Sequence, residues 1–232
     1  MMQTAMLHES HARTQAALHA VAVPAERGLV HIVDDDALVR VGLSRLLRSL
    51  GYAAAEFDSS ESFLRARCPD APGCLLLDVA MPGLDGPGLQ QKLQQDGDGI
   101  PVVFLTGAAD VPTCAATMRR GATSFLMKPV DEDQLTAAID VALARDVAQR
   151  AARARRTEVE SRLASLTPRE REVLNHVMNG RLNKQIASDL GTVEKTVKVH
   201  RARAMEKMRV RSVAELVRVV ERARGGGAGA DV

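Results

Sequence analysis

Polar residues follow directly after four short apolar runs, and their types could together bind a metal ion and an anion. They are Asp34, Asp35 and Asp36 after residues 29–33, Asp78 after 74–77, Thr106 after 102–105, and Lys128 after 125–127. A cluster of carboxylates supplies the oxygen ligands that a hard divalent cation prefers, Mg²⁺ above all. A lysine beside that cluster can hold an anionic third party such as a phosphoryl group.

The elements that must position these residues follow from the same pattern. A short apolar run between turn signals is typical of a strand buried on both faces of a parallel sheet. The carboxyl ends of such strands line one crevice of an open α/β sheet, so we expect the polar residues to meet there. The expected strands are 29–33, 52–57, 74–78, 101–105 and 124–127, and the expected helices are 37–50, 60–67, 89–95, 112–120 and one that starts after Asp131. This alternation predicts a doubly wound α/β domain with five parallel strands over residues 28–145.

The helix expected after Asp131 has no clear stop signal. Residues 135–163 are rich in Ala, Arg and Glu and contain neither Gly nor Pro, which favours a charged helical linker over 146–165. A flexible tether is the other interpretation of this segment. Residues 1–27 are expected to form a flexible extension, and residues 226–232 a disordered tail.

Charge divides the 232-residue chain into two parts of opposite sign. Residues 1–149 carry 12 Lys and Arg against 19 Asp and Glu, and residues 150–224 carry 19 against 9, although the net charge of the chain is only +2. An acidic part followed by a basic part predicts two domains with different tasks, and nucleic acid is the expected partner of the basic one. A well-solvated basic surface would produce the same imbalance.

The three cysteines and the hydropathy pattern indicate the compartment. Cys68, Cys74 and Cys114 are odd in number and lack CxxC spacing, so neither a disulfide framework nor a zinc site is indicated. No run of about 18 apolar residues could span a membrane, and the first residues lack the apolar core of a signal peptide. We therefore expect a reduced, cytoplasmic setting without membrane contact.

Capping signals predict an all-α domain of four helices over residues 166–225. Thr167 and Glu170 form a capping box that opens the first helix. The second and third helices are joined by a short turn that contains Gly191, which predicts a helix-turn-helix. Val193 precedes the third helix and cannot cap it with its side chain, so the start of that helix could shift by a residue. The expected helices are 168–178, 183–190, 194–208 and 213–224.

The third of these helices has one apolar stripe and one cationic face. Its cations are Lys195, Lys198, Arg201, Arg203 and Lys207, and its apolar residues are Val197, Ala204 and Met208. A helix of this kind can lie in the major groove of DNA.

Two sets of motifs resemble known families. Residues 33–36, the run Leu77–Gly83, Thr106-Gly107 and Lys128-Pro129 resemble the receiver domain of two-component response regulators, which has a flavodoxin-like fold. Residues 166–174, 183–187 and 196–201 resemble the LuxR-type helix-turn-helix domain. The combination resembles the NarL/FixJ branch of response regulators, and residues 106–112 are closest to its FixJ members.

The resemblance implies a phosphoacceptor and a metal site. Asp78 would attack the phosphohistidine of a sensor histidine kinase and become an aspartyl phosphate. Mg²⁺ would be held by Asp35, Asp78 and the Ala80 carbonyl, with Asp34 completing the pocket partly through water. The protein would then not be an enzyme beyond self-phosphorylation and slow autodephosphorylation.

The resemblance also implies a switch that transmits phosphorylation. Lys128 would pair with a phosphoryl oxygen, and Thr106 would donate a hydrogen bond to the same group. Phe125 would then turn inward to fill the space that Thr106 vacates.

For the basic domain, the resemblance implies a transcription regulator that forms a homodimer on phosphorylation and binds double-stranded promoter DNA. RNA polymerase is a further candidate partner. The residues expected to contact DNA are Lys184, Lys195, Thr196, Lys198, Val199, Arg201 and Arg203.

Two other functions are compatible with parts of the sequence. One is a DNA-binding transcription factor whose receiver domain is structural and needs no phosphorylation. The other is an enzyme, either a receiver-gated ATPase or a phosphotransfer relay. No GxxxxGK[ST] loop occurs in the chain, which argues against an ATPase, and a relay would not need a basic helix-turn-helix.

Overall fold

The computed structural model describes residues 27–68, 71–107 and 111–225. The chain divides after Ala148 into two compact units. The expected N-terminal extension and C-terminal tail lie outside the described residues, apart from Arg27. Among the helices of the described ranges, none is both long and apolar enough to cross a bilayer.

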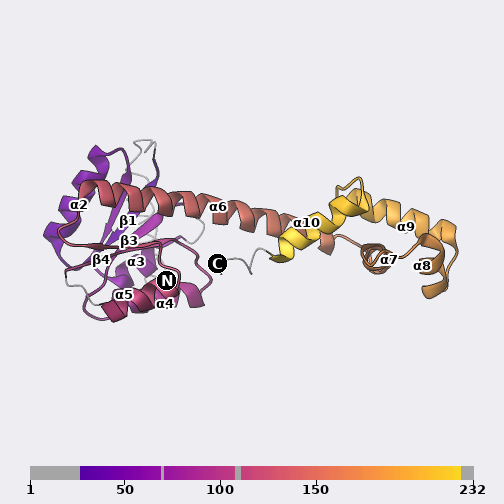
Figure 1. The fold of residues 1–232 in the computed structure, drawn as a ribbon, viewed down its shortest axis with the longest axis horizontal. Helices are drawn as coiled ribbons and strands as arrows, with labels where there is room; N and C mark the ends of the chain where they lie inside the picture. Colours follow the sequence, from indigo (N-terminus) through magenta and orange to yellow (C-terminus); the bar gives the residue numbers. More distant parts are fainter. Residues whose placement is uncertain (1–26, 69–70, 108–110, 226–232) are drawn as a thin grey trace, which may run out of the picture. The chain divides into compact units, whose positions relative to one another are not determined.

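The first unit is a five-stranded sheet with helices on both faces (Figure 1). The strands lie in the order β2-β1-β3-β4-β5, and every neighbouring pair is parallel. This order confirms the predicted doubly wound α/β fold. Successive strands are added to one side of β1 and then to the other, so the switch point of the strand order lies between β1 and β3. The elements are β1 (Leu29–Val33), α2 (Ala37–Ser49), β2 (Ala53–Phe57), α3 (Ser60–Ala66), β3 (Cys74–Asp78), α4 (Gly86–Gln95), β4 (Val102–Thr106), α5 (Val111–Arg119), β5 (Ser124–Met127) and α6 (Glu132–Ala164).

The core lies on both faces of the sheet, and β3 and β4 are therefore buried along their whole length. Leu76 belongs to a cluster with Leu47 of α2 and Ile139 of α6. The next residue, Leu77, points to the opposite face and clusters with Phe63 of α3, because side chains alternate along a strand. Both faces of the central strands are thus filled by apolar groups, and polar chemistry is left to the strand ends.

Helix α4 begins at Gly86 and not at Leu89, so the predicted start of this helix was wrong. Asp85 caps it, since its Oδ1 accepts a hydrogen bond from the Gly88 amide at 2.8 Å. Glycine is required at position 86, because a Cβ there would lie 2.3 Å from the carbonyl oxygen of Asp78. The glycine-rich sequence thus conceals a helix start that packs closely on the end of β3. The other expected element ends agree with the structure within one residue.

Helix α6 is 33 residues long and continuous from Glu132 to Ala164. Its residues from 149 onward belong to the second unit. There Val159 and Leu163 join the cluster around Leu174, and the Arg162 guanidinium donates to the backbone carbonyl of Met208 at 3.1 Å. The last turns of α6 are therefore part of the core of the second unit.

Four further helices complete the second unit, which confirms the predicted all-α domain. α8 and α9 form the helix-turn-helix, and Ile186 and Val197 from these helices pack with Val173 and Val177 of α7. The four helices are α7 (Pro168–Met178), α8 (Asn183–Asp189), α9 (Glu194–Lys207) and α10 (Val213–Gly225).

The start of α7 carries the predicted capping box. Thr167 Oγ1 accepts from the Glu170 amide at 3.3 Å, and Glu170 Oε2 accepts from the Thr167 amide at 2.9 Å. Glu170 Oε2 also accepts from Lys207 Nζ of α9 at 2.6 Å. These bonds, that to Lys207 first, lower the pKa of Glu170, so the carboxylate stabilises the fold above its ordinary pKa and loses this effect in acid.

We expect Thr167→Ala to lower the free energy of unfolding of the second unit by about 1 kcal/mol, because an N-cap acceptor is lost. The matched control is Thr157→Ala, an exposed position inside α6 where alanine favours the helix. Urea unfolding followed by circular dichroism measures both variants. Equal stability of the two variants would contradict the role of the cap.

Candidate functional site

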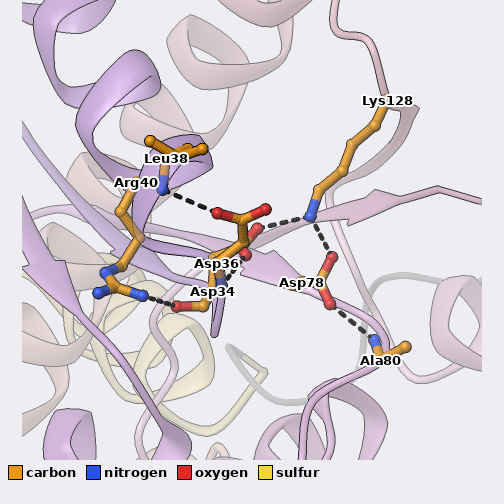
Figure 2. Close-up of polar contacts among 7 residues, drawn as sticks. All are labelled: Asp34, Asp36, Leu38, Arg40, Asp78, Ala80 and Lys128. Atoms are coloured by element: carbon orange, nitrogen blue, oxygen red, sulfur yellow. Dashed lines mark hydrogen bonds and ion pairs between the residues drawn. The ribbon is translucent and has the colours of Figure 1, made fainter.

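The carboxyl ends of three strands bring together the side chains of Asp34, Asp78 and Lys128 (Figure 2). Asp34 follows β1, Asp78 is the last residue of β3, and Lys128 follows β5. The Lys128 amide donates to the carbonyl of Thr106 at 2.7 Å, which continues the pairing of β4 and β5 to the crevice. Four residues predicted from the sequence therefore lie at one edge of the sheet.

A lysine bridges two buried carboxylates at this edge. Lys128 Nζ donates to Asp34 Oδ2 at 2.6 Å and to Asp78 Oδ1 at 2.5 Å. The second oxygen of Asp78 accepts from the Ala80 amide at 2.9 Å, and the second oxygen of Asp34 accepts from the Asp36 amide at 2.9 Å. Asp34 is fully buried and Asp78 is 5 % exposed. Each carboxylate is thus held by donors on both of its oxygens.

The three consecutive acids after β1 have different environments. Asp34 points into the crevice, Asp35 is exposed, and Asp36 caps α2 by accepting from the Leu38 amide at 2.8 Å. Arg40, one turn further along α2, donates to the backbone carbonyl of Asp34 at 2.7 Å. Sequence reasoning missed both positioning contacts, although an acid directly before a helical pattern is a capping signal.

Burial and ion pairing shift the pKa values of Asp78 and Lys128. Burial is the main cause that raises the pKa of Asp78, and the hydrogen bond from Lys128 opposes it only in part. Burial alone would lower the pKa of Lys128, but its bonds to Asp34 and Asp78 outweigh this and raise it. Lys128 is therefore stabilised in its protonated form. Burial disfavours the ionised form of Asp78, and further positive charge nearby would stabilise that form.

The possible metal ligands in the crevice suit a hard cation, since the side chains of Asp34 and Asp78 offer only oxygen atoms. Across the described part of the chain, no three His, Cys, Asp or Glu side chains are gathered as a metal site, and Asp35 is exposed beside the pair. Mg²⁺ commonly uses one or two carboxylates and keeps several waters, so a pair of acids with a backbone carbonyl such as that of Ala80 fits it.

The two residues predicted to form the switch lie on β4 and β5. Thr106 is 6 % exposed at the end of β4. Phe125 is half-buried, and the centroid of its ring lies 6.1 Å from that of Phe104. The ring thus already packs against the core beside the crevice.

In the second unit, the residues predicted to contact DNA differ in exposure. Thr196 and Arg201 are half-buried, and Arg201 donates to Asn183 Oδ1 of α8 at 3.0 Å. Lys198 is exposed but forms an ion pair with Glu194 at 3.0 Å. The exposed members of the set are Lys184, Lys195, Lys198, Val199 and Arg203.

Helix α9 begins at Glu194, so its start does not shift as the sequence allowed. Val193 occupies the N-cap position without a side-chain hydrogen bond and is 64 % exposed. The backbone carbonyl of Val193 still accepts from the amides of Thr196 and Val197.

The two units define a class of regulator: an α/β domain with a lysine-bridged acidic crevice, followed by a helix-turn-helix with a cationic second helix. Residues 30–140 match the response regulator receiver domain, and residues 164–220 match bacterial regulatory proteins of the luxR family. The chain belongs to the two-component response regulators with a LuxR-type DNA-binding domain, as the motifs predicted. Neither matched family is an enzyme family.

Similar proteins have the same organisation over most of their length. The chain is 42% identical over 194 residues to the response regulator protein TodT of Pseudomonas putida, covering 84% of this chain and 86% of that one. It is 43% identical over 190 residues to the transcriptional regulatory protein FixJ of Azorhizobium caulinodans, covering 82% and 90%. Among solved structures, the response regulator StyR is similar with a TM-score of 0.76 and 45% identity, covering 84% of this chain and 99% of that one. The chain is thus a transcriptional response regulator.

Proposed function

We propose that Asp78 accepts a phosphoryl group from a sensor histidine kinase, and that the phosphorylated protein dimerises and binds promoter DNA. The observation that carries this proposal is the position of Asp78 at the end of β3, with the Lys128 ammonium 2.5 Å from its Oδ1. A buried carboxylate beside a fixed cation can act as a nucleophile towards a phosphoryl group, whose oxygens the cation then neutralises.

In the transfer step, a carboxylate oxygen of Asp78 attacks the phosphorus of a phosphohistidine. The new O–P bond forms as the P–N bond breaks, and the imidazole of the kinase leaves. The Lys128 ammonium exchanges its hydrogen bond to the Asp78 carboxylate for one to an oxygen of the transferred phosphoryl group. Asp34 holds the ammonium in position through the 2.6 Å contact. Self-phosphorylation by a small phosphodonor and slow autodephosphorylation would use the same residues.

The residues that would hold Mg²⁺ are Asp35, Asp78 and the Ala80 carbonyl, with Asp34 partly through water. The ion would supply positive charge to the phosphoryl oxygens during transfer. Because burial raises the pKa of Asp78, a cation at this place also favours the ionised nucleophile.

The switch would act through Thr106 and Phe125. Thr106 donates to the phosphoryl group, and the half-buried ring of Phe125 moves further inward beside Phe104. A change of this kind alters the surface around β4 and β5 and so favours the dimer.

The output step would be the binding of double-stranded DNA by α9. Lys195, Lys198, Val199 and Arg203 are exposed on it, and Thr196 borders them. Lys184 of α8 is exposed as well and would contact a backbone phosphate. Arg201 would mainly position α9, since it is bonded to α8. RNA polymerase is a further proposed partner. DNA and a kinase partner together imply action in the cytoplasm.

The function is tested by phosphorylating the full chain with acetyl phosphate and Mg²⁺. We expect light scattering to show a dimer after phosphorylation, and DNA affinity for a site selected from random duplexes to rise with it. Unchanged mass and affinity after complete phosphorylation would favour the alternative, a transcription factor whose receiver domain is structural.

We expect Lys128→Ala to keep Mg²⁺ binding and to lose the output. The ammonium is not a metal ligand and competes with a cation for Asp34 and Asp78, so the Mg²⁺ affinity should be equal or higher. The phosphorylated variant lacks the cationic partner of its phosphoryl group, so the dimer should not form. Calorimetric Mg²⁺ titration and light scattering measure both effects, with Lys92→Ala on the surface of α4 as the control. Full dimerisation of the variant would show that Lys128 does not transmit the signal.

A further inference from the structure

A small cavity lies in the second unit between the start of α7 and the N-terminal half of α9. Its volume is about 130 Å³, well above the roughly 10–15 Å³ that one water molecule needs on the same measure. The polar side chains that line it are those of Arg169, Thr192, Thr196 and His200. The remaining lining residues are Val, Leu and Gly, so no acid borders the cavity, and its polar groups suit an anion.

Arg169 can supply the charge for an anion in this cavity. Its guanidinium is paired with Glu172 at 2.8 Å, and the two side chains are 60% and 47% exposed. An exposed pair of this kind is weak and readily exchanged. The planar guanidinium binds phosphate more favourably, through two parallel hydrogen bonds.

We propose that this cavity binds one phosphodiester group of the DNA backbone, held by Arg169 and the hydroxyls of Thr192 and Thr196. The inference rests on the proposed DNA binding by α9. The first turns of a recognition helix enter the major groove, and phosphates form both walls of that groove. Thr196 borders the cavity and follows the exposed Lys195, so the cavity lies beside the turns that would face such a wall. The contact carries no sequence information and positions the helix.

The first experiment compares Arg169→Gln with Arg218→Gln in the full chain. Arg218 is an exposed arginine of α10 that donates to a backbone carbonyl of its own helix, so the control removes the same charge elsewhere. Anisotropy titrations use a selected duplex and a scrambled duplex over a series of salt concentrations. Arg169→Gln should weaken binding to both duplexes alike by roughly three- to tenfold and lower the salt slope by about 0.9, as for one lost phosphate contact. Arg218→Gln should change the affinity for either duplex by no more than about twofold and should leave the salt slope unchanged.

A second experiment replaces single phosphates of the selected duplex by neutral methylphosphonates. Substitution at one phosphate position should weaken DNA binding by the wild type but should have no further effect on DNA binding by Arg169→Gln. Thr196→Val should lose the same coupling, whereas Thr196→Ser, which keeps the hydroxyl, should retain it. Inorganic phosphate is added at constant ionic strength to test the free ion as the ligand.

Three results would overturn the inference alone: equal effects of Arg169→Gln and Arg218→Gln, no methylphosphonate position coupled to Arg169, or a thermal stabilisation by inorganic phosphate that needs Arg169 while DNA binding does not. A wild type that binds neither duplex would overturn the proposed function and this inference with it.

Discussion

Asp78→Asn should abolish phosphorylation of the protein. The wild type incubated with acetyl phosphate and Mg²⁺ should gain one phosphoryl group, and mass spectrometry of its peptides should locate that group on Asp78. The amide of asparagine is not a nucleophile, so the rate should fall at least about 10³-fold, as is usual when a covalent nucleophile is removed. Asp96→Asn, an exposed carboxylate at the end of α4, is the matched control and should be phosphorylated normally.

The same variant should remain folded, because its stability follows from the pKa of Asp78. That pKa is raised in the folded protein, mainly by burial. Ionised Asp78 therefore reduces stability as the pH rises from its ordinary pKa through its raised one, and asparagine avoids this cost. We expect a melting temperature at neutral pH no lower than that of the wild type without Mg²⁺. A phosphoryl group found on Asp34 or Asp35 of the wild type would refute the assignment of the acceptor.

DNA binding should depend steeply on salt, and two lysines should affect it differently. Lys184→Ala should weaken binding to all sequences alike and lower the salt slope by about one unit, because it removes one phosphate contact. Lys198→Ala should instead weaken the selected site more than a scrambled duplex, by about 1–3 kcal/mol if Lys198 reads a base edge. Its pair with Glu194 is a surface contact across one helical turn and should break readily.

These effects are measured by anisotropy titrations of the full chain, phosphorylated and unphosphorylated, on both duplexes and at several salt concentrations. Two copies should occupy a near-palindrome with half-sites roughly one helical turn apart. Lys92→Ala, which removes a charge from the first unit, should leave all values unchanged. A flat salt dependence, or a tight complex with a single copy, would contradict DNA recognition by α9.

Local signals in the sequence were enough to predict most elements and their boundaries. The apolar runs at 74–77 and 102–105 predict buried strands, because a central parallel strand needs apolar side chains on both faces. The capping box of Thr167 and Glu170 predicts the start of α7, because its hydrogen bonds join residues three positions apart. The start of α4 was not predictable in this way, since Gly86 is there to fit the Asp78 carbonyl and not for helix propensity.

The types of the site residues were likewise predictable, but their contacts were not. The sequence shows three consecutive acids, and only the structure distinguishes the buried Asp34 from the exposed Asp35 and the capping Asp36. It also shows cations along α9, yet only the structure ties Arg201 to Asn183.

By itself, the sequence determined which polar groups end the strands and that a basic helix-turn-helix follows, because burial, side-chain alternation and capping act over a few neighbouring residues. Tertiary structure decided that Lys128 bridges Asp34 and Asp78, which precede it by 94 and 50 residues. It also decided that Arg169, Thr196 and His200 surround one cavity. Such contacts depend on how separate elements pack against one another, and the geometry of that packing is set by the side chains of the whole core rather than by any local run of residues.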